Sequence, residues 1–356
     1  MRNVNVLVVT SASLDEGFLD DIKAVDPRLT IVDGRQAFAA EIIKENKQGQ
    51  GYDRFLKELG LSSDWHIPET MVDLDTLLAQ AEVIFISFLF PDKLITRAPR
   101  AKWIHIGNTG IDQFIASDIF SGRVIVTNSR GAIASPMAEL TVGFIFALAK
   151  NIPRLLKNKK DKHWTRLVNL ELLGKTVGII GLGAVGSQVA RLAKGIGMRV
   201  IAVEKAAIRR SYNIWGIDEV YTGEELLDML HESDFVVMSA PLTAETQALI
   251  GEKEFRAMKA TAYLINVARG KLIDEPVLVR ALKEGWIAGA GLDVFDTEPL
   301  PSGNELWELP NVVISPHIAG SVDTRSPKIV GLFCNNLKRY LAGQQLINIV
   351  DKEKGF

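Results

Sequence analysis

The stretch TVGIIGLGAVG, residues 176–186, constrains the fold of this chain more than any other part of it. An apolar run typical of a buried strand leads into the pattern Gly181-x-Gly183-x-x-Gly186, and a helical pattern follows directly. The first glycine permits a tight turn, the second lets a bound phosphate approach the backbone, and the third lets the helix pack closely on the strand. The stretch therefore predicts a strand, a turn and a helix whose N-terminus binds phosphate.

A second strand pattern, RVIAVE, follows this helix and ends on Glu204. In dinucleotide-binding folds, an acid about 20 residues beyond the glycines holds the adenosine ribose hydroxyls. A glycine pattern alone is weakly specific, but the strand, the helix and the acid together predict a dinucleotide-binding domain. Glu204 would repel a ribose 2′-phosphate, which favours NAD(H). Lys205, Arg209 and Arg210 are typical of a loop that holds this phosphate, so NADP(H) stays open.

Short β-branched runs alternate with helical patterns along the chain, which predicts α/β domains with parallel sheets flanked by helices. The expected strands are 4–9, 83–87, 103–106, 124–127, 177–180, 200–203, 235–238, 262–266 and 312–314. The expected helices are 136–149, 185–194, 224–231, 275–283 and 325–341. The polar residues 44–60 are expected to form a surface excursion with a short helix. Because the glycine signature is central, we expect a middle domain flanked by a domain built from both chain ends.

Composition narrows the class of protein further. A hydrophobic content of 47% argues against disorder, and a net charge of −2 gives no field that would attract nucleic acid or an anionic membrane. The single cysteine, Cys334, fits a reducing compartment. The longest apolar runs are about half the roughly 20 residues of a spanning helix, and residues 4–9 are too short for the apolar region of a signal peptide. We expect a cytoplasmic protein with neither nucleic acid nor membrane as a partner.

Chemically active side chains follow expected strands in the second half of the chain. Arg269 comes just past residues 262–266, Asp293 ends another strand pattern with Glu298 shortly beyond, and His317 follows residues 312–314. Each residue alone is more often structural or solvated. Open α/β sheets, however, bind ligands at the carboxyl ends of their strands, so these side chains are expected near one site.

This combination of a cation, a carboxylate and an imidazole suits hydride transfer to a 2-keto acid. Arginine holds the substrate carboxylate as a planar fork and polarises the carbonyl group. Histidine donates a proton to the oxygen as hydride reaches the carbon, and a carboxylate beside it favours the imidazolium form. We expect no metal in such a site.

Five stretches in a fixed order resemble the D-isomer-specific 2-hydroxyacid dehydrogenases: GLGAVG with the later glutamate, APLTAETQALI, NVARGKLIDE, GLDVFDTEPLP and SPHIAGS. The resemblance runs from about residue 100 to the C-terminus. It implies that Arg269 binds substrate, Glu298 is the partner of the histidine, and His317 is the acid/base. The cofactor contacts that it implies are Gly181, Gly183, Ala184, Val185, Gly186, Glu204, Ala240, Thr246, Val267, Asp293 and Gly320, with Asp293 at the nicotinamide end.

Two stretches resemble the family's substrate-binding segments. In IHIGNTGID, residues 104–112, the backbone amides of Asn108, Thr109 and Gly110 would take the substrate carboxylate. SFLFP, residues 87–91, resembles the family's cleft loop, and Phe88 and Phe90 would make the pocket apolar, favouring an uncharged substrate side chain. An equally open interpretation places these rings in the core at a strand end.

The resemblance also implies an architecture. A Rossmann dinucleotide-binding domain, residues 103–318, would be inserted in a flavodoxin-like substrate domain, residues 1–102 and 319–356, with a hinged cleft. The pattern at residues 135–150 resembles the family's domain-crossing and dimer-forming helix. It implies a homodimer formed through the dinucleotide-binding domain.

These motifs together predict an NAD(H)-dependent D-2-hydroxyacid dehydrogenase that works as a 2-keto acid reductase. One alternative is a binding protein, an NAD(H)-responsive regulator similar to the corepressors of the same family, which keep the arginine, glutamate and histidine. A different Rossmann enzyme, such as a methyltransferase, shares the glycine pattern but not the ordered motifs that follow it.

Overall fold

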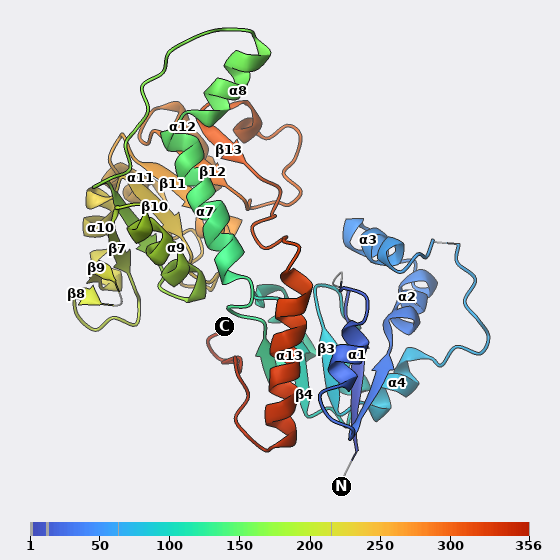
Figure 1. Ribbon diagram of the computed structural model, residues 1–356. Coiled ribbons are helices and arrows are strands. Elements are labelled where there is room, and N and C mark those ends of the chain that lie inside the picture. The colour runs from blue at the N-terminus through green and yellow to red at the C-terminus, as the bar shows by residue number, and fades with distance from the viewer. Residues whose placement is uncertain (1–2, 12–13, 63, 215, 356) are drawn as a thin grey trace. The chain divides into compact units, whose positions relative to one another are not determined.

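The computed structural model describes residues 3–11, 14–62, 64–214 and 216–355. The chain divides into two compact units: a smaller unit of residues 1–132 with 323–356, and a larger unit of residues 133–322. Each unit is a sheet flanked by helices (Figure 1). The expected fold class, a central α/β domain within an α/β domain built from both chain ends, is confirmed.

The described residues of the smaller unit form a five-stranded parallel sheet in the order β2-β1-β3-β4-β5. The strands are β1 (Val4–Val9), β2 (Leu29–Asp33), β3 (Val83–Ile86), β4 (Trp103–Ile106) and β5 (Ile125–Asn128). The helices are α1 (Phe18–Lys23), α2 (Arg35–Lys44), α3 (Gln50–Glu58), α4 (Leu74–Gln80), α5 (Leu94–Arg97), α6 (Asp118–Ser121), α13 (Arg325–Leu341) and the 3-10 helix η1 (Asp112–Phe114). This strand order is the flavodoxin-like one, whose ligands bind beyond the carboxyl ends of the strands.

Both faces of the smaller sheet are buried, which explains its apolar strands. Successive strand residues point to opposite faces. In β1, Val6 and Val8 pack with α1 and α13, whereas Leu7 and Val9 pack with α2 and α4. A strand buried on both sides reads as a continuous apolar run rather than an alternating one.

The described residues of the larger unit form an eight-stranded sheet in the order β13-β12-β11-β10-β6-β7-β9-β8, parallel except for the antiparallel pair β8 and β9. The strands are β6 (Thr176–Ile180), β7 (Arg199–Val203), β8 (Ser211–Ile214), β9 (Ile217–Tyr221), β10 (Phe235–Met238), β11 (Tyr263–Asn266), β12 (Gly289–Leu292) and β13 (Val312–Ile314). The chain reverses its direction of winding between β6 and β10. Doubly wound folds bind dinucleotides at this switch point.

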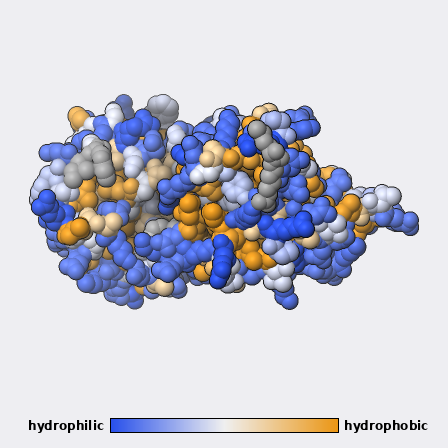
Figure 2. Space-filling view, turned by 90° about the horizontal axis from the view of Figure 1, so that it is seen from below, coloured by the Kyte–Doolittle hydropathy of each residue, from blue (hydrophilic) through white to orange (hydrophobic). Residues whose placement is uncertain are grey.

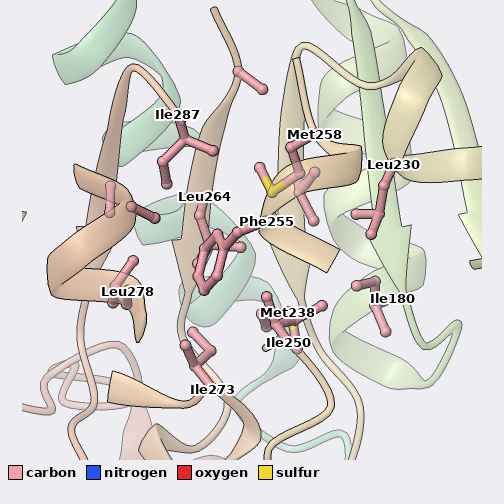
Figure 3. Packing of buried hydrophobic residues seen from close by; sticks show 14 of the residues in the cluster. Ile180, Leu230, Met238, Ile250, Phe255, Met258, Leu264, Ile273, Leu278 and Ile287 are labelled. Atoms are coloured by element: carbon pink, nitrogen blue, oxygen red, sulfur yellow. The ribbon is translucent and has the colours of Figure 1, made fainter. Parts of the chain in front are cut away.

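Helices cover both faces of the larger sheet. The helices of this unit are α7 (Ala134–Ala149), α8 (Ile152–Lys160), α9 (Ala184–Gly195), α10 (Leu226–Glu232), α11 (Glu252–Ala257), α12 (Glu275–Lys283) and the 3-10 helices η2 (Gly223–Glu225), η3 (Gly270–Leu272) and η4 (Glu305–Glu308), of which α8 has no buried residue. On one face, Phe255 of α11 and Leu278 of α12 pack over Leu264 of β11 (Figure 3). The other face is covered by α7 and α9. Each fully buried Leu or Phe contributes roughly 1.5–3 kcal/mol.

The division between the units differs from the expected boundary at residues 102 and 103. Strand β4 pairs in parallel with β3, and β5 pairs with β4. Residues 103–132 therefore belong to the smaller sheet, because their strands complete it. At the far side, the larger unit runs to Val322, a few residues past the expected end at 318.

Strands β2, β8, β9 and β12 were not among the expected strands. β2 lies at a sheet edge and is only partly buried, and β12 reads GAGL, which lacks the β-branched residues typical of a strand. The polar segment 44–60 does contain a helix, α3. Its Phe55 is buried against the ring of Phe38, at 5.6 Å between centroids, so this part of the segment belongs to the core rather than to a surface excursion.

Hydrophilic residues predominate on the face drawn in Figure 2, with hydrophobic residues set among them. A folded domain ordinarily exposes this mixture. Among the residues that the structure describes, no helix combines the length and apolarity needed to cross a membrane.

Candidate active site

The glycine-rich turn joins β6 to α9 at the switch point of the larger sheet. Gly181 has a φ of +94°, a left-handed conformation that suits glycine, and a Cβ there would lie 3.0 Å from the Ala240 backbone. A Cβ on Gly186 would lie 2.1 Å from the Gly181 carbonyl oxygen, so glycine is needed for α9 to pack this closely. Around Gly183 the described residues leave the Cβ position open. A phosphate can therefore reach the backbone at the start of α9.

The first turn of α9 supplies the donors for that phosphate. The helix begins at Ala184, so the N–H groups of Ala184 and Val185 have no acceptor within the helix. The Ser239 hydroxyl donates to the Gly181 carbonyl oxygen at 2.7 Å, which ties the turn to the segment after β10. The turn and helix fit the pyrophosphate of a dinucleotide.

Glu204 lies just beyond β7, beside the glycine turn. Its carboxylate accepts the backbone N–H of Leu182 at 2.9 Å and that of Ala206 at 3.2 Å. Each carboxylate oxygen keeps a further lone pair, so the group can also accept ribose hydroxyls. The structure thus places Glu204 where the sequence pattern puts the ribose-binding acid.

Two of the three cations after Glu204 are engaged by carboxylates. Lys205 pairs with Glu245, and Arg210 donates to Glu219 at 2.5 Å. Arg209 is exposed. The positive charge of this loop is therefore largely neutralised by carboxylates of the same unit.

The remaining residues expected at the cofactor lie on neighbouring strand-end loops. Ala240 follows β10, and Thr246 stabilises the next turn by accepting the backbone N–H of Thr243 at 2.8 Å. Val267, just past β11, is 1% exposed, so its side chain belongs to the core. Gly320 is half-buried, three residues beyond the histidine of the SPHIAGS stretch.

Arg269 lies in the loop after β11, and two features fix this loop. The Asn266 side chain donates to the Arg269 carbonyl oxygen at 2.8 Å. A Cβ on Gly270 would lie 1.9 Å from the carbonyl carbon of Phe295. The loop after β11 therefore lies directly against the loop after β12, and this contact requires glycine.

Glu298 and His317 form a hydrogen-bonded pair. Nδ1 of His317 lies 2.6 Å from Oε2 of Glu298, and the Phe295 backbone N–H donates to Oε1 at 3.0 Å. Burial alone would raise the pKa of Glu298, but the hydrogen bonds from His317 and Phe295 and the charge of Arg269 hold this pKa below its usual value. The His317 side chain is 48% exposed, and its Nε2 has no hydrogen-bond partner among the described residues. One ring nitrogen is thus oriented by a carboxylate, and the other is accessible.

Asp293 anchors the loop that carries this histidine. The carboxylate is fully buried, and its oxygens accept the Ser315 hydroxyl at 2.5 Å and the backbone N–H groups of Ile318 at 2.8 Å and Ala319 at 2.9 Å. The His317 N–H donates to the Asp293 carbonyl oxygen at 2.8 Å. Asp293 is thus a structural anchor of this loop, and its expected contact with the nicotinamide end of the cofactor stays a prediction.

In the smaller unit, Asn108, Thr109 and Gly110 follow β4. Asn128 donates to the Thr109 carbonyl oxygen at 3.1 Å, and the Ser129 N–H donates to the Asn108 carbonyl oxygen at 3.0 Å. Asn108 is 4% exposed, and its Oδ1 and the Thr109 Oγ1 have no hydrogen-bond partner among the described residues. Buried oxygens without partners are rare in folded proteins and are often found where water or a ligand supplies the donor.

Phe88 and Phe90, both expected to line the substrate pocket, have different environments. Phe88 is 49% exposed after β3. Phe90 stacks on the fully buried Phe114, with 4.8 Å between ring centroids. Phe90 is therefore partly buried against the core of the smaller unit, and Phe88 is the more exposed ring; the role of both rings in the substrate pocket stays a prediction.

Sequence reasoning missed the contacts by which Gly270, Ser239 and Ser315 shape the site. The signal for Gly270 was its place directly after Arg269 in a strand-end loop. The two serines each follow a strand, but serine is common in such loops, so their hydrogen bonds required the structure.

A doubly wound sheet with a glycine-rich turn at its switch point, and an imidazole–carboxylate pair at its strand ends, defines a Rossmann-fold oxidoreductase. Residues 142–319 match the family model described as "D-isomer specific 2-hydroxyacid dehydrogenase, NAD binding domain". The chain is 37% identical over 270 residues to a glyoxylate reductase of Thermofilum pendens, covering 73% of this chain and 78% of that protein. It is 33% identical over 294 residues to a glyoxylate reductase of Pyrococcus furiosus, covering 80% and 84%.

A solved structure resembles the whole chain. It is a D-isomer specific 2-hydroxyacid dehydrogenase from Xanthobacter autotrophicus Py2 in complex with NADPH and MES, with a TM-score of 0.77, 25% identity and 100% coverage of both chains. The present chain belongs to the D-isomer specific 2-hydroxyacid dehydrogenase family. It is an oxidoreductase that acts on CH–OH groups and carries a domain for a nicotinamide dinucleotide.

Proposed function

We propose that this protein reduces a small 2-keto acid to the corresponding D-2-hydroxy acid. The observation that carries the proposal is the pair formed by His317 and Glu298, with 2.6 Å between Nδ1 and Oε2. The pair lies at the carboxyl ends of strands in the dinucleotide-binding unit. A half-exposed imidazole oriented by an ionised carboxylate is suited to deliver a proton.

Each residue of the proposed site has a separate task. The glycine-rich turn, the first turn of α9 and Glu204 would hold a reduced nicotinamide dinucleotide, which would supply the hydride for the substrate carbonyl carbon. His317 holds a proton on Nε2 and gives it to the carbonyl oxygen as negative charge develops there. Glu298 stabilises the imidazolium form and fixes the ring. Arg269 binds the substrate carboxylate and polarises the carbonyl group. The family resemblance gives the backbone N–H groups of Asn108, Thr109 and Gly110 the role of donors to the substrate carboxylate.

We assign NAD(H) as the preferred cofactor. Glu204 stands where a ribose 2′-phosphate would be repelled, and Lys205 and Arg210 are already paired with carboxylates. A free basic pocket for the 2′-phosphate would have favoured NADP(H) instead. The ratio of kcat/KM for NADH over NADPH should exceed one, and a ratio below one would overturn this assignment.

We also propose that the protein is a cytoplasmic homodimer formed through the larger unit. In that unit α8 has no buried residue, and the segment after it exposes Trp164 by 97% and Val168 by 95%. Large exposed apolar side chains mark association surfaces. Sedimentation velocity should give twice the chain mass, and replacing Trp164 and Val168 by serine should give the monomer. A monomeric parent chain would contradict this proposal.

A substrate panel tests the proposed reaction. Oxidation of NADH is followed with glyoxylate, hydroxypyruvate, pyruvate, phenylpyruvate, oxaloacetate and 2-ketoglutarate, and the product configuration is determined by chiral chromatography. The proposal expects turnover with at least one of these acids and a D product. Absence of turnover across the panel with both NADH and NADPH, or an L product, would contradict the proposed reaction.

A further inference from the structure

Arg325 lies at the ligand-binding edge of the smaller unit. It is the first residue of α13, which packs on the sheet through Ile329 and Phe333. Ser326, the next residue, accepts the Asp15 backbone N–H at 2.9 Å. Asp15 follows β1, so the N-terminus of α13 lies at the carboxyl ends of the strands. Flavodoxin-like sheets bind their ligands at this edge.

The guanidinium of Arg325 is placed over the ring of Phe88, with 5.6 Å from Cζ to the ring centroid. Phe88 is the accessible ring of the loop after β3, the segment assigned above to the substrate. The loop after β4, with Asn108, lies next to this one, because the Gly107 N–H donates to the Ile86 carbonyl oxygen at 2.8 Å. Arg325 is therefore beside the segments expected to contact substrate.

The surroundings of Arg325 contain a cation rather than an anion. Among the described residues no carboxylate oxygen lies within 4.0 Å of its nitrogens. Burial, followed by the like charge of Arg54 on α3, lowers the pKa of Arg325. Arg54 is itself paired with Glu58 at 2.9 Å. A partly buried charge without a partner costs free energy, so such a group is expected where a ligand supplies the opposite charge.

We infer that Arg325 is a specificity-determining residue that binds a second anionic group, carboxylate or phosphate, on the 2-keto acid substrate. Arginine presents a planar fork of N–H donors that matches both groups, and Phe88 supports the guanidinium plane. The inference rests on the proposed reductase function and refines its substrate class. It replaces the expectation of an uncharged substrate side chain, which considered only the aromatic residues of the SFLFP loop.

The test compares 2-keto acids of matched length that differ in their distal group. The pairs are oxaloacetate with 2-ketobutyrate, 2-ketoglutarate with 2-ketovalerate, and phosphohydroxypyruvate with hydroxypyruvate. For each pair kcat/KM with NADH is measured for the parent protein, Arg325→Gln and Arg325→Lys. The first two pairs report on a carboxylate and the third on a phosphate.

The parent protein should prefer the acidic member of at least one pair. Arg325→Gln should lower kcat/KM for that member by at least about 10-fold more than for its neutral partner, since a hydrogen bond to a charged group contributes about 1.5–3 kcal/mol. Arg325→Lys should recover part of the preference, because it keeps the charge but not the fork. Arg54→Gln, at a site 77% exposed, is the matched control and should retain it.

Two outcomes would overturn the inference. One is a parent protein that prefers the neutral member of every pair. The other is an Arg325→Gln variant that loses activity equally with both members of each pair. That result would mean that Arg325 either binds the 2-keto carboxylate common to both members or stabilises the fold. Thermal unfolding and NADH binding of the variant separate these last two cases. If the parent protein reduces neither member of any pair, the proposed function itself fails.

Discussion

His317 has a backbone conformation that is unusual for a residue with a side chain. Its φ is +54°, in the left-handed region that few non-glycine residues adopt. The His317 N–H is held by the Asp293 carbonyl oxygen, and the ring by Glu298. Such a strained backbone conformation persists only where the surrounding structure enforces it, and strained residues of this kind cluster at functional sites. The backbone and the ring of this residue are thus fixed independently.

Glu298→Gln is expected to move the pH dependence of reduction. The pKa of Glu298 is held below its usual value, so the carboxylate is ionised at neutral pH and stabilises the imidazolium of His317. Glutamine keeps the size but removes the charge. The alkaline limb of kcat/KM for reduction should therefore shift to lower pH, while NADH affinity stays close to that of the parent. Superimposable pH profiles for the two proteins would rule out the pairing.

At the scale of elements, the site is built from the loops after β11, β12 and β13. Parallel strands end at the same edge of a sheet, so these loops are neighbours. Gly270 lets the first two loops touch, and the Asp293 carboxylate at the end of β12 receives donors from the loop after β13. The sheet therefore sets the spacing of the three chemical groups, and the hydrogen bonds set their orientation.

Asp293→Asn tests whether this residue positions the histidine loop rather than the cofactor. An asparagine would turn one N–H₂ group toward a backbone N–H, leaving a buried donor unsatisfied at a cost of about 1–3 kcal/mol. We expect kcat to fall by roughly 10-fold or more, with the NADH dissociation constant from fluorescence titration changed much less. A large loss of NADH affinity with kcat retained would instead support contact with the nicotinamide.

The elements differ in how far sequence could predict them. The bounds of strands β1, β3 and β10 were predicted to within one residue, because strands buried on both faces have a continuous apolar sequence. Strands β2 and β8 lie at sheet edges, where mixed polarity hides them. The boundary between the units was misplaced because β4 and β5 have the same apolar signal in either sheet, and only strand pairing assigns them.

The candidate site shows the same limit. The strand ends predicted that Glu298 and His317 would lie near one site, and the family resemblance implied that they form a pair. An acid at a strand end suits both a cofactor contact and a loop anchor, and the hydrogen bonds by which Asp293 anchors the loop required the structure. For Phe90, the stacking partner Phe114 is distant in sequence. Arg325 was recognised only as a helix start, since its lack of a carboxylate partner is a property of the fold.

At the scale of the molecule, His105 links the stability of the smaller unit to pH. The side chain is fully buried on β4, with Nδ1 at 2.8 Å from the Thr127 hydroxyl and Nε2 at 3.2 Å from the Ser129 hydroxyl. Burial lowers the pKa of His105 to about 3 from a usual 6.5. The unfolded chain therefore takes up a proton below about pH 6.5 that the folded chain does not accept until about pH 3.

Acidification should accordingly destabilise the smaller unit. The pKa of His105 is lower in the folded chain than in the unfolded chain, so protonation of His105 has no effect on stability above about pH 6.5. As the pH drops from about 6.5 toward 3, protonation favours the unfolded chain, and the free energy of unfolding falls by up to about 1.4 kcal/mol per pH unit. Hydrogen exchange of β4 amides at pH 7 and pH 5, corrected for intrinsic rates, measures the change. His105→Gln should show a smaller difference between the two pH values, and an equal difference would contradict the assignment.

The central claim, that His317 is the proton donor of a 2-keto acid reductase, is tested most directly by His317→Ala. The measurement is kcat for reduction of the best panel substrate at saturating NADH, with the NADH dissociation constant determined on the same samples. We predict that kcat falls by at least about 10²-fold, while NADH binding remains close to that of the parent protein. A variant that binds NADH and keeps the parent's turnover would contradict the account.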